Sequence, residues 1–467
     1  MDNDHRPEIT RAVAAFALTT KWEDIPDEVV AIAIDHILDT YGVMLSGVNE
    51  DTARIVREVF TGGGGGALVV GTSQRSDAIT AALVNGVAGH ALDYDDTQLS
   101  TSVEGVYGLL THPSVPVLSA VSSVAEERGL SGAALVASYV VGVEVACRVA
   151  DAIAPRHYQA GFHSTGTIGA IGAAAGVAHL LGLDETRMRM ALGIAASMSS
   201  GLRENFGTMT KPLHSGRAGQ SGVSAALLAE RGFTASQEIL EAPRGFFSAA
   251  GGGFRAEKVL GQLGKPFFLL DPGVSIKPYP SGSLSHPAQD LILDFVISND
   301  LHPDEVKRVE VGTNSNVLNA LIHHRPTTGL QGKFSMEYCM ATAVLRRRAG
   351  LAEFTDAGVN DPDIQAFIPR VDVVVDPRLE AMGYQHVRSR VRVETVDGNI
   401  FEGEAEWAQG YPTKPLSADQ LAGKFVDCAR ESLGDEHAWA AIEGIRKLPL
   451  AAQAGDIVAL LNPSREA

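Results

Sequence analysis

Residues 163–183, HSTGTIGAIGAAAGVAHLLGL, decide the fold class of this chain. Small and apolar residues fill most positions, and glycine recurs at Gly166, Gly169 and Gly172. A helix that is apolar on every side has to be buried, and glycines let a neighbouring backbone approach closely. The spacing G-x-x-G-x-x-G is not the dinucleotide fingerprint and follows no predicted strand. We therefore expect a core helix that begins after His163 and packs closely against other helices.

Helical patterns surround this stretch from Pro7 to about Leu263. Start signals precede four further apolar-periodic segments, at Pro26-Asp27, Ser76-Asp77, Leu130-Ser131 and Leu183-Asp184. Side-chain oxygens at such positions cap the free amides of a helix start, and proline is favoured there. Five or more such helices with short connections predict a helical bundle.

The pattern changes near Lys265. Three segments alternate like strands: Val306–Gly312, Val371–Val375 and Val387–Val396. Asp397-Gly398 lies between two strand-like runs and is typical of a hairpin turn. The chain becomes helical again after Pro412. We predict a mainly α protein, in which residues 265–405 form a smaller α+β domain inserted into a large all-helical domain of residues 1–264 and 406–467.

Composition excludes several classes of protein. The chain has 467 residues and a formal net charge of −18, which argues against a nucleic-acid partner and against a polybasic membrane partner. Its 3 cysteines are far apart and form no C-x-x-C pair, so neither a disulfide framework nor a cysteine zinc site is supported. The polar segment from Met1 to Pro7 lacks the apolar core of a signal peptide. We expect a cytoplasmic protein.

Five polar segments interrupt the apolar pattern and could carry chemistry. Their candidate residues are Asp93 and Thr97 in GHALDYDDT (89–97), His112 in THPS (111–114), Tyr158 and His163 in YQAGFHSTGT (158–167), Arg203 and Lys211 between 203 and 217, and Lys277, Tyr279 and His286 in KPYPSGSLSHP (277–287). Histidine is the natural acid or base near neutral pH, and a helix start favours a carboxylate. Lysines in an otherwise acidic chain suit an anionic substrate.

The absent motifs narrow the chemistry further. The sequence has no G-x-x-x-x-G-K-[ST] phosphate loop, no H-E-x-x-H and no G-x-S-x-G nucleophile elbow. His90 and its neighbouring aspartates could ligate a metal, but no second histidine lies at helical spacing, so we expect no metal site. Histidines, lysines and an aspartate without a cofactor motif favour cofactor-free proton transfer on an anionic carbon acid.

Six motifs in register resemble those of the MmgE/PrpD family over nearly the whole chain. They are GHALDYDDT at 89–97, HPS at 112–114, GFHSTGTIGA at 161–170, the lysine-containing segment at 210–234, KPYPSGSLSHP at 277–287 and KFSMEYC at 333–339. The resemblance implies a helical domain with an α+β lid domain, a homodimer, and no organic cofactor. It also implies a pocket made of Asp93, Thr97, His112, His163, Lys211, Lys277, Tyr279 and, at a matched helix start, His286.

Family members include 2-methylcitrate dehydratase, cis-aconitate decarboxylase and iminodisuccinate epimerase, which act on small di- or tricarboxylates. The sequence departs from two branches of the family. Its link QLSTSVEGVYGLLT between Thr97 and His112 is longer than that of decarboxylase-type members, and SGSLSHP after Pro280 lacks the cysteines and the arginine common in dehydratase-like members. Both departures favour the epimerase. We predict that Lys211 and Lys277 hold the carboxylates while His163 or His112 removes a proton α to one of them, with epimerisation as the outcome. The alternatives are a dehydratase, a cis-aconitate decarboxylase-like lyase, and a non-catalytic protein that binds small acids.

Within that prediction Asp93 orients a histidine or a lysine. Tyr158, Arg203, Thr97, Tyr279 and His286 complete the expected substrate-binding set. Which histidine is the base and which is the acid stays open from sequence.

Overall fold

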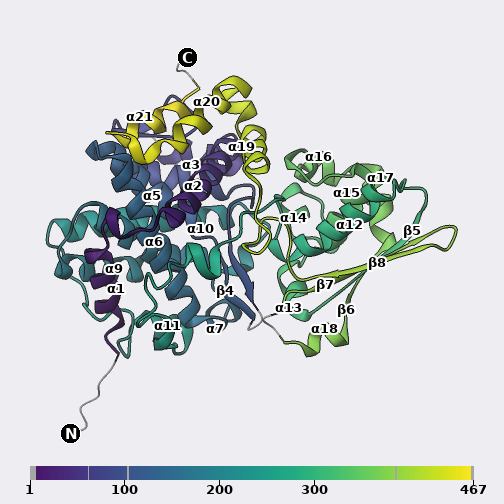
Figure 1. Ribbon diagram of the computed structural model, residues 1–467, viewed down its shortest axis with the longest axis horizontal. Coiled ribbons are helices and arrows are strands. Elements are labelled where there is room, and N and C mark those ends of the chain that lie inside the picture. The colour runs from purple at the N-terminus through teal and green to yellow at the C-terminus, as the bar shows by residue number, and fades with distance from the viewer. Residues whose placement is uncertain (1–6, 61–62, 103–104, 384–385, 464–467) are drawn as a thin grey trace, which may run out of the picture.

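The computed structural model describes residues 7–60, 63–102, 105–383 and 386–463, with the backbone alone for 100–102 and 105–110 (Figure 1). Met1–Arg6, on which the expected absence of a signal peptide rests, lie outside the described residues. About 60% of the chain is helical and about 9% is strand, which confirms the predicted mainly α class.

The larger part of the molecule is a stack of helices, purple to teal and yellow in Figure 1. Its helices are α1 (Ile9–Thr19), α2 (Asp27–Gly47), α3 (Asp51–Phe60), α4 (Ala78–His90), α5 (Ser114–Arg128), α6 (Gly132–Ile153), α7 (Arg156–Gln159), α8 (Ser164–Leu180), α9 (Glu185–Met198), α10 (Thr210–Glu230), α11 (Phe246–Gly251), α19 (Ala418–Leu433), α20 (Asp435–Arg446) and α21 (Ala454–Val458). Helix α8 lies among α5, α6, α9 and α10, and all its residues from Ser164 to Ala178 are buried. The predicted core helix after His163 is confirmed.

The predicted helix starts are also confirmed by their caps. The side chains of Asp77, Ser131 and Asp184 accept hydrogen bonds from backbone amides three residues on, at the starts of α4, α6 and α9. Pro26 immediately precedes α2. Each cap satisfies an amide that has no partner inside its own helix.

Glycines permit the close approach of α8 to α6. A Cβ atom at Gly172 would lie 2.7 Å from the Cβ of Ala146 and 2.8 Å from the carbonyl oxygen of Gly142. Both distances are shorter than carbon contacts allow, so only glycine fits without moving a helix. Close packing is therefore the role of this glycine.

The smaller part contains a four-stranded sheet, green to yellow-green in Figure 1. Its strands are β5 (Val306–Thr313), β6 (Val371–Val375), β7 (Ser389–Thr395) and β8 (Ile400–Ala405), in the order β6-β5-β7-β8. Only β5 and β6 are parallel among these pairs, and Gly398 turns the predicted hairpin between β7 and β8 with φ of 88°. Its helices are α12 (His286–Ser298), α13 (Ser315–Ala320), α14 (Gly329–Gly332), α15 (Met336–Arg346), α16 (Asp356–Val359), α17 (Pro362–Phe367) and α18 (Pro377–Ala381).

Two hydrophobic cores are larger than the others among the described residues. The first joins the N-terminal helices to α19, α20 and α21, and the second lies between the sheet, α12 and α15. Phe267 and Phe268 pack into the first core, whereas Ala408 and Tyr411 pack into the second. Both pairs lie beyond residues 265 and 405, and the domain boundaries at those two residues stay a prediction.

Two short hairpins complete the architecture: β1 (Ala67–Leu68) with β2 (Arg75–Ser76), and β3 (Gln98–Ser102) with β4 (Gly105–Thr111). The second hairpin is formed by the long link after Thr97. Because its strands run antiparallel, it returns the chain to His112 close to the place where it left Thr97.

Helices α2 and α6 are long and apolar enough to cross a membrane by length and composition. In this structure 72% and 89% of their most apolar windows are buried against other parts of the chain. The apolarity of both helices is accounted for by their place in the first core.

Adding one methyl group at Gly172 should destabilise the protein, whereas adding one at an open glycine should not. Gly172→Ala forces α6 and α8 apart and should lower the free energy of unfolding by about 1–3 kcal/mol. Gly423, inside α19, has no atom within 4 Å of the position that a Cβ would occupy. Gly423→Ala should raise the free energy of unfolding by about 0.5–1 kcal/mol through helix propensity. Urea denaturation measures both, and equal effects of the two changes would contradict the packing role.

Candidate active site

A buried carboxylate, Asp93, lies at the centre of a cluster of charged side chains. It follows the end of α4 and has a positive φ of 53°, which is uncommon for a residue other than glycine. Lys211 Nζ donates to its Oδ1 at 2.6 Å, and Lys277 Nζ lies 3.1 Å from its Oδ2. Lys277 also donates to the backbone carbonyl of Asp93 at 2.8 Å. Burial alone would raise the pKa of Asp93, but the two ammonium groups hold it well below 3.8.

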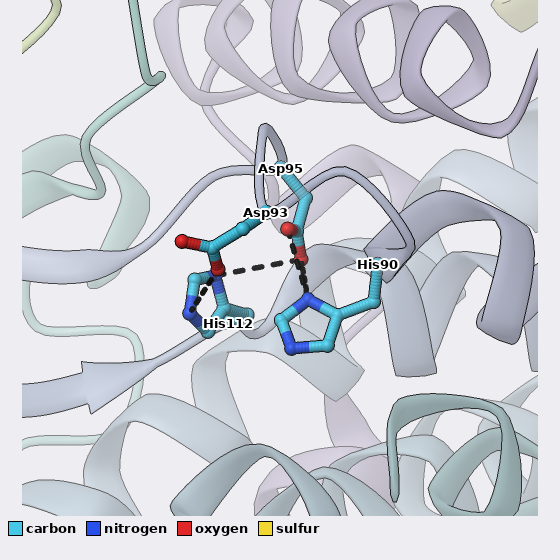
Figure 2. Close-up of side chains that lie close together, drawn as sticks. All are labelled: His90, Asp93, Asp95 and His112. Atoms are coloured by element: carbon cyan, nitrogen blue, oxygen red, sulfur yellow. Dashed lines mark hydrogen bonds and ion pairs between the residues drawn. The ribbon is translucent and has the colours of Figure 1, made fainter. Parts of the chain in front are cut away.

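His90 connects a second carboxylate to Lys211. Its Nδ1 lies 2.8 Å from Asp95 Oδ2 (Figure 2). On the other side of the ring, Lys211 Nζ lies 2.9 Å from Nε2. An ammonium group can only donate, so Nε2 of His90 accepts a hydrogen bond from Lys211. Nδ1 of His90 therefore carries the ring proton and donates a hydrogen bond to the carboxylate of Asp95. Burial, reinforced by Lys211, lowers the pKa of His90 well below 6.5. A chain of hydrogen bonds therefore runs from Asp95 through a neutral His90 to Lys211 and Asp93.

His112 is placed beside Asp93 by the β3–β4 hairpin. Its Nδ1 lies 2.8 Å from the carbonyl oxygen of Asp96, which can only accept, so Nδ1 carries the proton. Nε2 then holds a lone pair, and it lies 3.9 Å from Asp93 Oδ1. Burial lowers the pKa of His112 well below 6.5. The ring is therefore a neutral base near pH 7, in a fixed orientation.

His163 lies behind these groups. Its ring stacks on His90 with 5.6 Å between centroids, and its Nδ1 is 3.0 Å from Nδ1 of His214. Burial lowers the pKa of His163 well below 6.5 and that of His214 to about 4. Both rings are therefore neutral near pH 7.

A second buried ion pair supports the cluster from behind. Lys424 on α19 pairs with Asp39 on α2 and donates to the backbone carbonyls of Tyr94 and Lys277, at 2.9 and 2.8 Å. Tyr94 directly follows Asp93 in the chain, so Lys424 ties together the two segments that carry Asp93 and Lys277. The C-terminal helices therefore contribute to the geometry of the site, although none of their residues lines the cavity described next.

A small cavity opens beside Asp93, where residues of the second hydrophobic core face the charged cluster. Its lining is Asp93, His112, Tyr158, Phe206, Lys211, Lys277, Gly282, Ser283, Leu284, Ala320, Leu321 and Phe334. One wall is charged and the other is mostly apolar. The two lysines on its charged wall suit an anionic ligand.

The structure brings five of the predicted site residues to this cavity: Asp93, His112, Tyr158, Lys211 and Lys277. His163 adjoins the cluster through His90, as described above.

The remaining predicted residues support the walls from outside the lining. Arg203 lies over the ring of Tyr158, 3.6 Å from its centroid. Thr97 pairs with Ser275 through two backbone hydrogen bonds, which tie the Asp93 segment to the Lys277 segment. Tyr279 donates to Asp290 at 2.7 Å, and His286 Nε2 lies 3.1 Å from the carbonyl oxygen of Ser281. Substrate binding by these four residues stays a prediction.

Several residues at the site were not predicted. His90, Asp95 and Lys333 stand within motifs that the sequence singled out, GHALDYDDT and KFSMEYC, so a signal for them existed. Phe334 stands in KFSMEYC as well, next to Lys333. Phe206, which also contributes to the apolar wall, carries no comparable signal, because isolated aromatic residues occur throughout a protein core.

The same cluster has the composition of a metal site. One ligand atom from each of His90, Asp93, Asp95 and His112 lies within 4.8 Å of the others (Figure 2). However, Lys211 donates to both His90 and Asp93, and Lys277 pairs with Asp93. A cation among these ligands would face two buried ammonium groups at close range. The geometry favours the lysines, rather than a metal ion, as partners of the carboxylate.

Removal of divalent metals is accordingly expected to leave the protein unchanged. Dialysis against EDTA should not alter the Tm, because Lys211 and Lys277 already neutralise Asp93. Differential scanning calorimetry before and after dialysis measures this. A stoichiometric metal in elemental analysis, together with a lower Tm after chelation, would contradict it.

Comparisons with known proteins agree with this architecture. The MmgE/PrpD N-terminal domain matches residues 11–258, and the MmgE/PrpD C-terminal domain matches residues 279–448. Cis-aconitate decarboxylase of Homo sapiens is 27% identical over 459 residues, which cover 94% of this chain and 91% of that protein. A protein of the same name from Aspergillus terreus is 25% identical over 447 residues, covering 91% and 90%. The chain is an enzyme of the MmgE/PrpD family.

Proposed function

We propose that this enzyme is a cofactor-independent lyase that decarboxylates a small unsaturated tricarboxylate. This is the reaction for which its relatives, the cis-aconitate decarboxylases, are named. The observation that carries the proposal is the pair of buried ammonium groups, Lys211 and Lys277, on the wall of one cavity beside a neutral His112. The comparisons favour this lyase over the epimerase that we predicted from the departures in sequence, because the relatives named here are decarboxylases over nearly their full length.

Substrate binding rests on the two lysines. Lys211 and Lys277 are 3% and 1% exposed, so their charges act through little water. A carboxylate that enters the cavity can approach both ammonium groups while Asp93 keeps them in place. The apolar wall then faces the carbon skeleton of the substrate.

Decarboxylation needs a place for an electron pair. When the C–C bond to a carboxylate breaks, carbon dioxide leaves and the bonding electrons form a new double bond. The electrons of the old double bond then move to the carbon next to another carboxylate. That carboxylate becomes enediolate-like and gains negative charge, which the adjacent ammonium groups stabilise in a site of low dielectric.

The carbon that receives the electron pair has to take up a proton. His112 is neutral and its N–H is engaged by Asp96, so it is a base rather than an acid here. The ammonium group of Lys277 is an acid at the cavity, and burial lowers its pKa from 10.5. We assign the proton to Lys277, which is then reprotonated from solvent. His112 accepts a hydrogen bond from a protonated carboxyl group or from water in the cavity.

We further propose that the sheet-containing part acts as a lid, since Leu284, Leu321 and Phe334 from that part form the apolar wall over the charged groups. From the sequence we also propose that the enzyme is a homodimer and is located in the cytoplasm. We propose that it has no nucleic-acid or membrane partner. Analytical ultracentrifugation tests the assembly.

Incubation in deuterated water tests the reaction. With cis-aconitate we expect release of carbon dioxide and one solvent deuterium in the product, because the lysine proton exchanges with solvent. Exchange of the α-hydrogen of iminodisuccinate without release of carbon dioxide would return the assignment to epimerisation. Tight binding of the acids with neither outcome would favour the non-catalytic binding protein.

Removal of the Lys277 charge should abolish most activity. Lys277→Met keeps the length of the side chain but removes both the acid and the stabilising charge, so kcat should fall by roughly 10²–10³-fold. Lys307→Met is the matched control, since Lys307 is 60% exposed and pairs with Glu394 on the sheet. Steady-state kinetics measure both variants. Equal activity of the two would remove Lys277 from the mechanism.

The pH dependence should show an early loss of activity on the alkaline side. Lys277 acts while protonated, so activity is present below its pKa and is lost as the pH rises through it. Because burial lowers that pKa, kcat/KM should begin to fall below pH 10.5. The Tm over the same range separates this loss from unfolding. A constant kcat/KM up to pH 10.5 would contradict the assigned role.

A further inference from the structure

A third buried lysine, Lys333, lies near the cavity and forms no ion pair with the residues that the structure describes. Lys333 is 1% exposed, and its ammonium group donates to the carbonyl oxygen of Pro280 at 3.2 Å. Among the described residues no carboxylate forms an ion pair with it. The other buried lysines differ: Lys211 and Lys277 share Asp93, and Lys424 lies 2.6 Å from Asp39.

The ammonium group of Lys333 can donate further hydrogen bonds besides the one to Pro280. It has three donor hydrogens, and a desolvated charge with a single neutral partner is costly. The ring of Phe354, 5.3 Å from Nζ, offsets part of this cost. Burial lowers the pKa of Lys333 to about 8, so the group is still mostly protonated at pH 7. The carboxylates of Asp93 and Glu50 act on it only from beyond ion-pair distance, so an anion in close contact is the partner that it lacks.

Lys333 is also one of the residues that line a second hollow, which adjoins the main cavity. This second hollow is smaller than the main cavity. Asp93, Lys211 and Phe334 line both spaces, whereas Lys277 lines the main cavity and Lys333 the second hollow. A ligand held at Lys211 can therefore extend toward either of the other two lysines.

The charges around the two hollows are unequal. The residues that line them include three lysines, Lys211, Lys277 and Lys333, but a single carboxylate, Asp93. A ligand with one carboxylate would leave part of this excess positive charge around the cavity and the second hollow unbalanced. A ligand with several carboxylates would place one of them at each ammonium group.

We propose that the second hollow is a carboxylate subsite and that Lys333 is the residue by which the enzyme selects tricarboxylates over dicarboxylates. This inference rests on the proposed function, because it extends the same site. The backbone holds Lys333 in place: its carbonyl accepts from the amide of Gly282 at 2.8 Å, on the segment that carries Lys277. The second subsite is thereby coupled in position to the first.

Two acids that differ by one carboxylate test the proposal. Propane-1,2,3-tricarboxylate has the chain of glutarate with one more carboxylate, and neither contains a double bond to react. Isothermal titration calorimetry with the native enzyme should show roughly 10- to 100-fold tighter binding of the tricarboxylate, the worth of one charge-assisted hydrogen bond. Equal affinities for the two acids, or no binding of either, would overturn the proposal.

The variant Lys333→Met should remove this difference in affinity and leave glutarate binding unchanged. It should also keep or raise the Tm, because replacing a poorly partnered buried charge by an apolar side chain is often neutral or stabilising. Lys307→Met, which removes an exposed charge from the sheet, should behave like the native enzyme in both titrations. If Lys333→Met still prefers the tricarboxylate by the native factor, Lys333 does not form the subsite.

Turnover separates this inference from the proposed function. Retained preference for the tricarboxylate in Lys333→Met, with normal decarboxylation by the native enzyme, would overturn the subsite alone. Loss of that preference in the variant would support the subsite even if the native enzyme released no carbon dioxide from cis-aconitate, in which case only the proposed reaction would fail.

Discussion

The ion cluster of Asp93 with Lys211 and Lys277 is the interaction on which the rest of the site depends. Burying one carboxylate and two ammonium groups costs several kcal/mol per ion unless each finds close partners. The distances of 2.6 and 3.1 Å meet that requirement for the carboxylate. They leave the ammonium groups with a net positive charge beside the cavity, which is what binding and stabilisation of an anion require.

This cluster is assembled from segments that are far apart in the chain. Asp93 follows α4, Lys211 lies in the first turn of α10, and Lys277 lies on the extended segment before α12. Helices α4 and α10 pack closely because glycines such as Gly86 and Gly216 meet at their contact, where a Cβ atom on Gly86 would lie 2.7 Å from Cα of Gly216. The same small residues that make the bundle compact therefore fix the geometry of the charges.

Local features of the sequence account for the helices, the hairpin and the chemical character of the site. Caps such as Asp77 and Ser131, the apolar stretch after His163 and the hairpin at Gly398 follow local rules, because their hydrogen bonds and φ values are settled within a few residues. The six motifs also indicated the family correctly. The choice between epimerase and lyase does not follow from such local rules, because the link between Thr97 and His112 folds as a hairpin and its length alone does not specify a reaction.

Tertiary structure alone decided which polar residues converge. It brought His112 and Lys277 to the cavity but left Tyr279 and His286 outside its lining, although all four stand in equally prominent motifs. It also showed that Lys333 is buried without an ion pair among the described residues, while Lys211 has one. The reason is that desolvation and Coulomb energy depend on distances between side chains from different elements, and helix packing sets those distances.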